Sequence, residues 1–168
     1  ARAYDELRPP ALGGRAALEA IGVGVAVFAL WIVLDSPWVT LGEPGAGFDP
    51  RRADGEIDWA LAAVRLFGAA AVVPIMEELF WRSFILRWID NPDFLRQLPA
   101  AASLRALAIS AVLFGVEHHQ WLAGILAGLA YGGLYMRSGT LWSPILSHAV
   151  TNLLLGLWVV TAGAWHFW

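Results

Sequence analysis

Several apolar segments of this chain are long enough to cross a lipid bilayer, and this constrains the fold more than any other feature. A helix rises about 1.5 Å per residue, so about 20 apolar residues span about 30 Å of hydrocarbon. Residues 16–34, 59–89 and 143–161 reach or approach that length, and residues 104–118 and 121–136 are shorter. The sequence therefore predicts an all-α, polytopic transmembrane helical bundle with about five membrane segments.

The composition agrees with a membrane location and excludes several other classes of protein. Of the 168 residues, 58% are hydrophobic and 15% are charged, a more apolar balance than that of an ordinary soluble domain. The chain has no cysteine, which excludes a disulfide framework, a thiolate nucleophile and a cysteine-ligated zinc site. It has no basic block that would indicate a nucleic-acid partner. We expect one membrane-embedded domain over residues 1–168, with the lipid bilayer around it.

The arginines predict the orientation in the membrane, because short cytoplasmic loops collect Lys and Arg. The arginines before the first segment, around the connection 90–100 and between the last two segments are Arg2, Arg8, Arg15, Arg87, Arg96, Arg105 and Arg137. The intervening loop 35–58 contains two arginines and six acidic residues. These positions predict a cytoplasmic N-terminus and an extracytoplasmic C-terminus.

Three charged residues interrupt the second apolar segment, in P74-I-M-E-E-L-F-W-R82. A charge near the bilayer centre costs about 2.5 to 3.5 kcal/mol on insertion scales, so an intramembrane cluster indicates function. Glu78 and Arg82 are four residues apart, acid first, and are predicted to pair. Glu77 is rotated about 100° from Glu78 on a helix and is expected to face elsewhere, without that arginine. Pro74 is expected to kink or break the segment.

Two further polar pairs have the same spacing of four residues. Phe114 and His118 lie in F-G-V-E-H-H, and His148 and Asn152 lie in S-H-A-V-T-N. Residues four apart share one face of a helix. A carboxylate, two histidines and an amide are suited to activating water and stabilising the oxyanion that forms when water attacks a carbonyl. The reaction class would be hydrolysis of an amide bond inside the membrane.

For the remaining polar and small residues, the sequence gives weaker evidence of a catalytic role. Glu117 and His119 flank His118 near the membrane boundary and are possible members of the site. His166, close to the last residue, is expected to take no part in it. The run G124-ILA-G128-LAY-G132 repeats a small residue every four positions and predicts close helix packing rather than chemistry.

Taken together, the motifs resemble those of the CAAX protease and bacteriocin-processing (CPBP/Abi) family of glutamic intramembrane proteases, which includes the Ras-converting CAAX endopeptidases. The matching motifs, spread over about residues 60–160, are E77-E78-x-x-x-R82, F114-x-x-x-H118 and H148-x-x-x-N152. The resemblance implies an intramembrane endopeptidase without a metal or other cofactor.

It also implies a role for each matching residue. Glu77 and His118 would activate the water, and His148 and Asn152 would form the oxyanion site. The supporting residues would be Glu78, Arg82 and Phe114.

The sequence around these motifs, F-G-V-E-H-H-Q-W-L-A-G and G-L-A-Y-G, is similar to that of the bacterial branch of the family associated with exosortase-type protein sorting. This implies a protein of the bacterial cytoplasmic membrane. The substrate would be a membrane protein with a C-terminal sorting helix instead of a prenylated CAAX protein. The larger family members have seven or eight spans. With about five spans here, the sequence does not identify which segments would form the walls of the substrate site.

Three other functions remain open on these residues. A zinc-dependent membrane hydrolase could draw its ligands from Glu77, Glu78, His118, His119 and His148, although the sequence has no HExxH pair. A non-proteolytic immunity or partner-binding membrane protein would keep the polar cluster only for packing. A proton-coupled transporter would use it as a relay.

Overall fold

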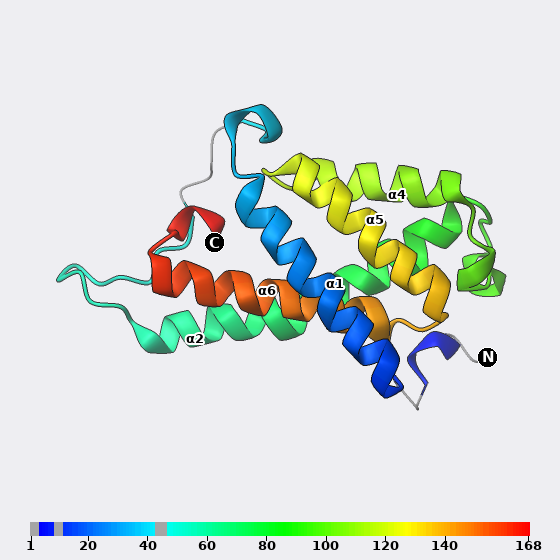
Figure 1. The fold of residues 1–168 in the computed structure, drawn as a ribbon, viewed down its shortest axis with the longest axis horizontal. Helices are drawn as coiled ribbons and strands as arrows, with labels where there is room; N and C mark the ends of the chain where they lie inside the picture. The colour runs from blue at the N-terminus through cyan, green and yellow to red at the C-terminus, as the bar shows by residue number, and fades with distance from the viewer. Residues whose placement is uncertain (1–3, 9–11, 43–46) are drawn as a thin grey trace.

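The computed structural model describes residues 4–8, 12–42 and 47–168, and helices form the whole architecture of that part (Figure 1). The main helices are α1 (Gly14–Val33), a long helix made of α2 (Trp59–Phe67), α3 (Val73–Glu78) and the stretches that join and follow them, α4 (Leu104–Val116), α5 (Trp121–Ser138) and α6 (Trp142–Ala162). The prediction of an all-α membrane bundle is confirmed. Arg2 and Glu43, which count toward the predicted orientation, lie outside the described residues.

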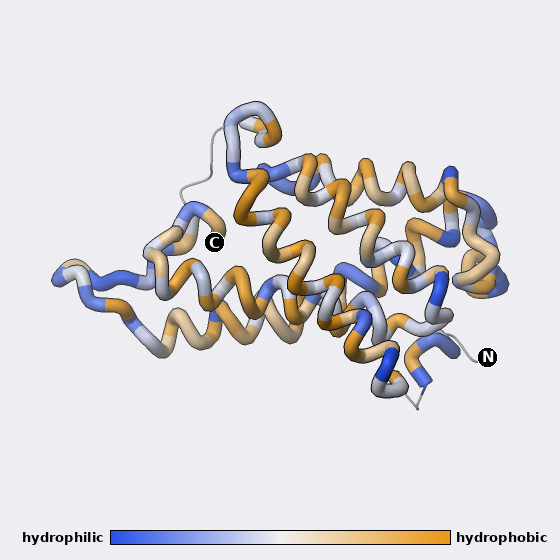
Figure 2. Tube along the Cα trace, in the orientation of Figure 1, coloured by the Kyte–Doolittle hydropathy of each residue, from blue (hydrophilic) through white to orange (hydrophobic). Residues whose placement is uncertain are grey.

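Three helices are long and apolar enough to cross a membrane: α1, the long helix Trp59–Leu86 and α6. The helix α4 has 13 residues, which is about 20 Å and too short to span the hydrocarbon alone. Apolar residues predominate along the helices, and polar residues concentrate at the helix ends and connections (Figure 2). The chain is a membrane protein whose bundle includes helices that do not each cross the full bilayer.

The small residues of α5 bring it against α4, as the sequence predicts. A side chain added at Gly128 would place its Cβ 2.8 Å from the Cα of Ala111, and one at Gly124 would lie equally close to the Cα of Gly115. Only hydrogen atoms at these positions allow such an approach of two helix backbones. The prediction of close helix packing is confirmed.

The long helix starts at a capped end and passes through Pro74 without a break. The Asp58 carboxylate accepts hydrogen bonds from the backbone N–H groups of Ala60 and Leu61. The stretches Gly68–Val72 and Leu79–Leu86 are wound as π-helix. Proline clashes with the carbonyl of an α-helical turn before it, and a wider π-turn accommodates the extra bulk. The expected interruption at Pro74 is therefore a change of winding within a continuous helix.

The helix α1 crosses α6 at Gly24. The Thr151 hydroxyl donates to the Gly24 carbonyl at 2.9 Å, and a Cβ at Gly24 would lie 2.4 Å from the Ser147 carbonyl oxygen. From this crossing the two helices diverge (Figure 1). We call the end of the bundle that carries the N-terminal segment and the connection 87–103 the arginine end. The opposite end, with residues 34–42, 47–58, 117–120 and 163–168, is the pocket end.

A polar connection fixes the start of α4 at the arginine end. The Ser103 N–H and hydroxyl both donate to the Asp90 carboxylate, at 2.6 and 2.7 Å. These hydrogen bonds, led by the one from the backbone N–H, lower the pKa of Asp90. The Ser103 hydroxyl oxygen in turn accepts from the N–H of Ala106 and caps α4.

Candidate active site

A cavity of about 690 Å³ opens between the diverging helices. Its lining includes the buried His148 and the half-buried Glu77, and also the exposed Asp35 and His166. The four residues predicted to be catalytic all line it, namely Glu77, His118, His148 and Asn152. Ligand sites in proteins commonly have volumes of about 300 to 1,000 Å³, so the cavity is large enough to hold part of a substrate.

Glu78 lies behind the cavity wall and is fully buried. Its Oε2 atom is 2.9 Å from Nε of Arg82, which confirms the predicted pair. Its Oε1 atom is 2.9 Å from Nδ1 of His148. An ionised carboxylate can only accept a hydrogen bond, so Nδ1 of His148 carries the proton in this bond. Glu78 thus orients His148, a link that the spacing of the motifs does not reveal.

Arg82 is 1% exposed. Its guanidinium is stabilised by an ion pair and by two aromatic rings. The contact with Glu78 has the distance of an ion pair, but no Arg82 nitrogen makes an aligned hydrogen bond to any described residue. The guanidinium carbon lies 4.7 Å from the ring centroid of Phe114 and 5.8 Å from that of Tyr131. Cation–π attraction is strongest where water is excluded. Phe114 therefore lies where a supporting residue would.

Glu77 faces the cavity, on a different side of the helix from Glu78, as predicted. Its Oε2 atom lies 4.0 Å from Nε2 of His148. This separation is too long for a direct hydrogen bond. The side chain as a whole is 32% exposed, but its Oε2 atom is buried and makes no hydrogen bond to a described residue.

His118 presents one ring nitrogen to the cavity because the other is already bonded. Its Nδ1 atom lies 2.7 Å from the Phe114 carbonyl oxygen, one helical turn earlier. A carbonyl oxygen accepts, so Nδ1 carries the proton and Nε2 of the neutral ring has a free lone pair. The ring packs against Phe114 and edge-on against Trp31, with centroids 4.6 and 5.4 Å away. His118 is held in the tautomer that can accept a proton at Nε2.

Asn152 connects α6 to the π-helical stretch of the long helix. Its Nδ2 atom donates to the Ala69 carbonyl at 2.9 Å. Val73, which would serve that carbonyl in an α-helix, donates to Gly68 instead. Pro74, the next candidate in a π-helix, has no N–H. Asn152 therefore replaces a backbone donor that the sequence removes, and the amide keeps a second N–H for another acceptor.

The structure places the remaining candidate residues differently. Glu117 is exposed and does not line the cavity. His119 lines the rim, and its Nδ1 atom lies 2.6 Å from the Leu41 carbonyl, so it ties the loop after α1 to the turn before α5. The expectation for His166 is wrong. It lines the cavity, and its Nε2 atom pairs with Asp35 at 2.9 Å.

Tyr131 was not identified as a site residue from the sequence. Its ring stacks on His148 with centroids 4.9 Å apart and an interplanar angle of 19°, and its hydroxyl donates to Thr151 at 2.7 Å. It belongs to the small-residue run of α5, which indicated packing only. The available signal was its position beside Gly132 and Gly128, but the spacing does not show which helix the ring would meet.

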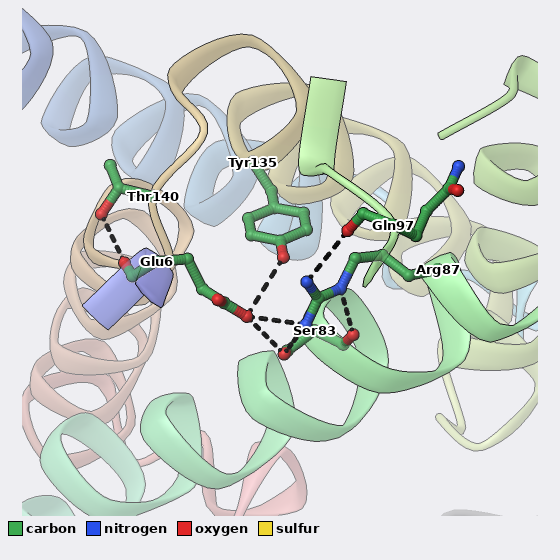
Figure 3. Close-up of polar contacts among 6 residues, drawn as sticks. All are labelled: Glu6, Ser83, Arg87, Gln97, Tyr135 and Thr140. Atoms are coloured by element: carbon green, nitrogen blue, oxygen red, sulfur yellow. Dashed lines mark hydrogen bonds and ion pairs between the residues drawn. The ribbon is translucent and has the colours of Figure 1, made fainter. Parts of the chain in front are cut away.

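A second buried polar cluster lies closer to the arginine end (Figure 3). Arg87 Nη2 and the Ser83 hydroxyl both donate to Oε1 of Glu6, each at 2.7 Å. The cluster joins the N-terminal segment to the long helix, α5 and the residues around them through Glu6, Ser83, Arg87, Gln97, Tyr135 and Thr140. None of these residues lines the cavity, so the cluster is separate from the candidate active site.

The zinc alternative needs three protein ligands around one point. Over residues 4–8, 12–42 and 47–168, no three His, Asp or Glu side chains gather closely enough to hold a metal ion. The described geometry thus offers no ligand set for that alternative.

Comparison with known protein families supports the family resemblance drawn from the sequence. Residues 59–154, more than half of the chain, match the model of a family described as "Type II CAAX prenyl endopeptidase Rce1-like". Neither the curated proteins nor the solved structures contain a match. The matched range includes every predicted site residue from Glu77 to Asn152.

Proposed function

Since the chain belongs to the Rce1-like family of type II CAAX prenyl endopeptidases and is a membrane peptide hydrolase, we propose that it cleaves its substrate by a glutamic mechanism, with Glu77 as the general base. The observation that carries the proposal is the placement of Glu77. Its carboxylate faces the cavity and lies 4.0 Å from Nε2 of His148, while Glu78 takes up the nearby arginine.

Water activation is assigned to Glu77 and His118. A carboxylate in a cavity walled by apolar side chains can remove a proton from a water within hydrogen-bond reach. His118 offers its free Nε2 to the same cavity, so it can share that proton as the water attacks the carbonyl carbon. Both groups can return the proton to the leaving amine.

Oxyanion stabilisation is assigned to His148 and Asn152. Nδ1–H of His148 is already bonded to Glu78, so donation to the oxyanion requires a second proton on Nε2. The donor form is therefore the imidazolium, held between two carboxylates. Asn152 would donate through the N–H that does not bind Ala69. Fixed donors of this kind stabilise charge best where water is excluded.

The substrate in this proposal is a membrane protein with a C-terminal sorting helix, in the bacterial cytoplasmic membrane. The aromatic side chains along the cavity, including Trp31, Phe167 and Trp168, suit an apolar peptide. Glu77 and the three other polar groups assigned above would then act on one bond of that peptide.

The test uses membranes that contain the protein and candidate substrates tagged beyond their C-terminal helix. We expect Glu77→Gln and His118→Ala each to lower the cleavage rate by about 10²- to 10⁴-fold. Glu117→Gln is the matched control, because Glu117 is exposed outside the cavity, and it should cleave like the parent. Normal cleavage by a folded Glu77→Gln variant would refute the glutamic mechanism. Inhibition by a chelator that zinc reverses would favour the metal-dependent alternative.

A further inference from the structure

We propose that the substrate reaches Glu77 from the extracytoplasmic face of the membrane. The bond cleaved would then belong to the extracytoplasmic juxtamembrane segment of an exported membrane protein. The identity of the substrate rests on the proposed proteolytic function, whereas the side on which the cavity opens is a property of the fold alone.

The outer lining of the cavity belongs to the pocket end. Asp35 lies two residues after the end of α1, Gln120 directly precedes α5, and His166 follows α6. All three line the cavity, and these helix ends lie at the same end of the bundle (Figure 1). From Glu77, the cavity therefore leads toward the pocket end.

Packed side chains lie between the cavity and the arginine end. Leu86, Tyr135 and Leu141 are each 0% exposed and belong to one apolar cluster. Beside them, the buried carboxylate of Glu6 is bonded to Arg87 and joins the N-terminal segment to the long helix (Figure 3). None of these five residues lines the cavity. A second pocket does open at the arginine end, between the start of α1 and the end of α5, but among the described residues it shares no lining residue with the cavity at Glu77.

The arginines assign the two ends to the two sides of the membrane. The described arginines at the arginine end are Arg8, Arg15, Arg87, Arg96, Arg105 and Arg137. At the pocket end, Arg51 and Arg52 are each paired with an aspartate of their loop, and Arg65 lies within α2 beside the cavity. Arginine-rich short connections stay in the cytoplasm, and acidic residues contribute little to this bias. The pocket end, and with it the opening of the cavity, is therefore extracytoplasmic.

The outer part of the cavity has the chemistry of a peptide site at a membrane boundary. Trp31 and Trp168 supply apolar walls, and Asp35, Arg65 and His166 supply polar groups. Aromatic residues of this kind favour the interface between lipid and water. A segment that is apolar at the scissile bond and polar toward the water fits this lining.

The chain contains no cysteine, so single introduced cysteines report the side of access directly. Leu155→Cys places a thiol in the cavity, Asp54→Cys places one on the exposed loop at the pocket end, and Ser138→Cys places one on the exposed arginine end. Each variant is expressed in the full chain and treated with a membrane-impermeant maleimide. Right-side-out vesicles, inside-out vesicles and detergent-solubilised protein are compared.

We expect Asp54→Cys and Leu155→Cys to be labelled in right-side-out vesicles and to lose that labelling in inside-out vesicles. Ser138→Cys should show the reverse pattern. Labelling of Leu155→Cys from the cytoplasmic face would overturn the inference. So would reaction of Leu155→Cys only in detergent, or in none of the three preparations, because the cavity would then open to lipid or be closed. The readout needs no substrate, so an inactive protein with the expected labelling would refute the proposed function and leave the inference standing.

Discussion

Glu77 and Glu78 are adjacent, yet their surroundings divide them into different tasks. Glu78 is fully buried and contacts both Arg82 and His148. Glu77 lines the cavity and makes no comparable pair with an arginine. The 100° rotation between neighbouring helix residues is enough to predict this division. It does not predict that Glu78 also holds a histidine 70 residues later in the chain.

The two contacts of Glu78 lead to a prediction for Glu78→Gln. The amide keeps the shape of the side chain but removes its charge, which leaves Arg82 buried without a counter-ion. Removing one partner of a buried ion pair costs about 3 to 5 kcal/mol. We therefore expect the free energy of unfolding in detergent micelles to fall by about that amount, with a parallel loss of cleavage. Glu117→Gln should change stability by less than about 0.5 kcal/mol. Equal stabilities of the two variants would contradict the account of Glu78.

At the scale of the helices, the continuous course of the long helix depends on a partner from α6. The π-helical stretch and Pro74 leave the Ala69 carbonyl without a donor from its own helix. Asn152 supplies the donor. A residue proposed for catalysis is thus also part of the contact that holds two helices together, and the same bond fixes the orientation of its amide.

This arrangement predicts energetic coupling between Pro74 and Asn152. In the parent, Asn152→Ala leaves the partly buried Ala69 carbonyl unpaired, which costs about 1 kcal/mol, the low end of the range for a fully buried group. In a Pro74→Ala background, residue 74 regains an N–H that can bond Ala69, so the cost of Asn152→Ala should shrink by about 1 kcal/mol. Chemical unfolding of the parent, the two single variants and the double variant measures this difference. Additive effects would show that Pro74 and Asn152 do not share the Ala69 carbonyl.

At the scale of the whole molecule, the two buried polar clusters lie in different parts of the bundle. The cluster at Glu77 and Glu78 borders the cavity, and the cluster at Glu6 and Arg87 lies closer to the arginine end. Glu6 bonds Arg87, which follows it by 81 positions in the sequence. The N-terminal segment is therefore part of the packing at the arginine end.

Glu6→Gln should destabilise the whole bundle, because Arg87 is 3% exposed and would lose its counter-ion. We expect a loss of about 3 kcal/mol in the free energy of unfolding. Asp5→Asn is the matched control, since Asp5 pairs with Arg8 on the surface, where an ion pair contributes little. The comparison uses thermal unfolding in detergent micelles. A Glu6→Gln variant as stable as Asp5→Asn would mean that the packing at the arginine end does not depend on this ion pair.

The sequence by itself determined the class of fold, the approximate bounds of the five main helices, the Glu78–Arg82 pair and the residues that line one site. These follow from segment length and from spacings of three or four residues, which depend on the geometry of a single helix. Only the tertiary structure decided that Glu78 bonds His148, that His166 and Tyr131 line the cavity, and that Glu6 pairs with Arg87. Those contacts depend on where α1 and α6 cross and how closely α4 and α5 approach. Helix crossings arise from the packing of many side chains at once, so no local pattern specifies them.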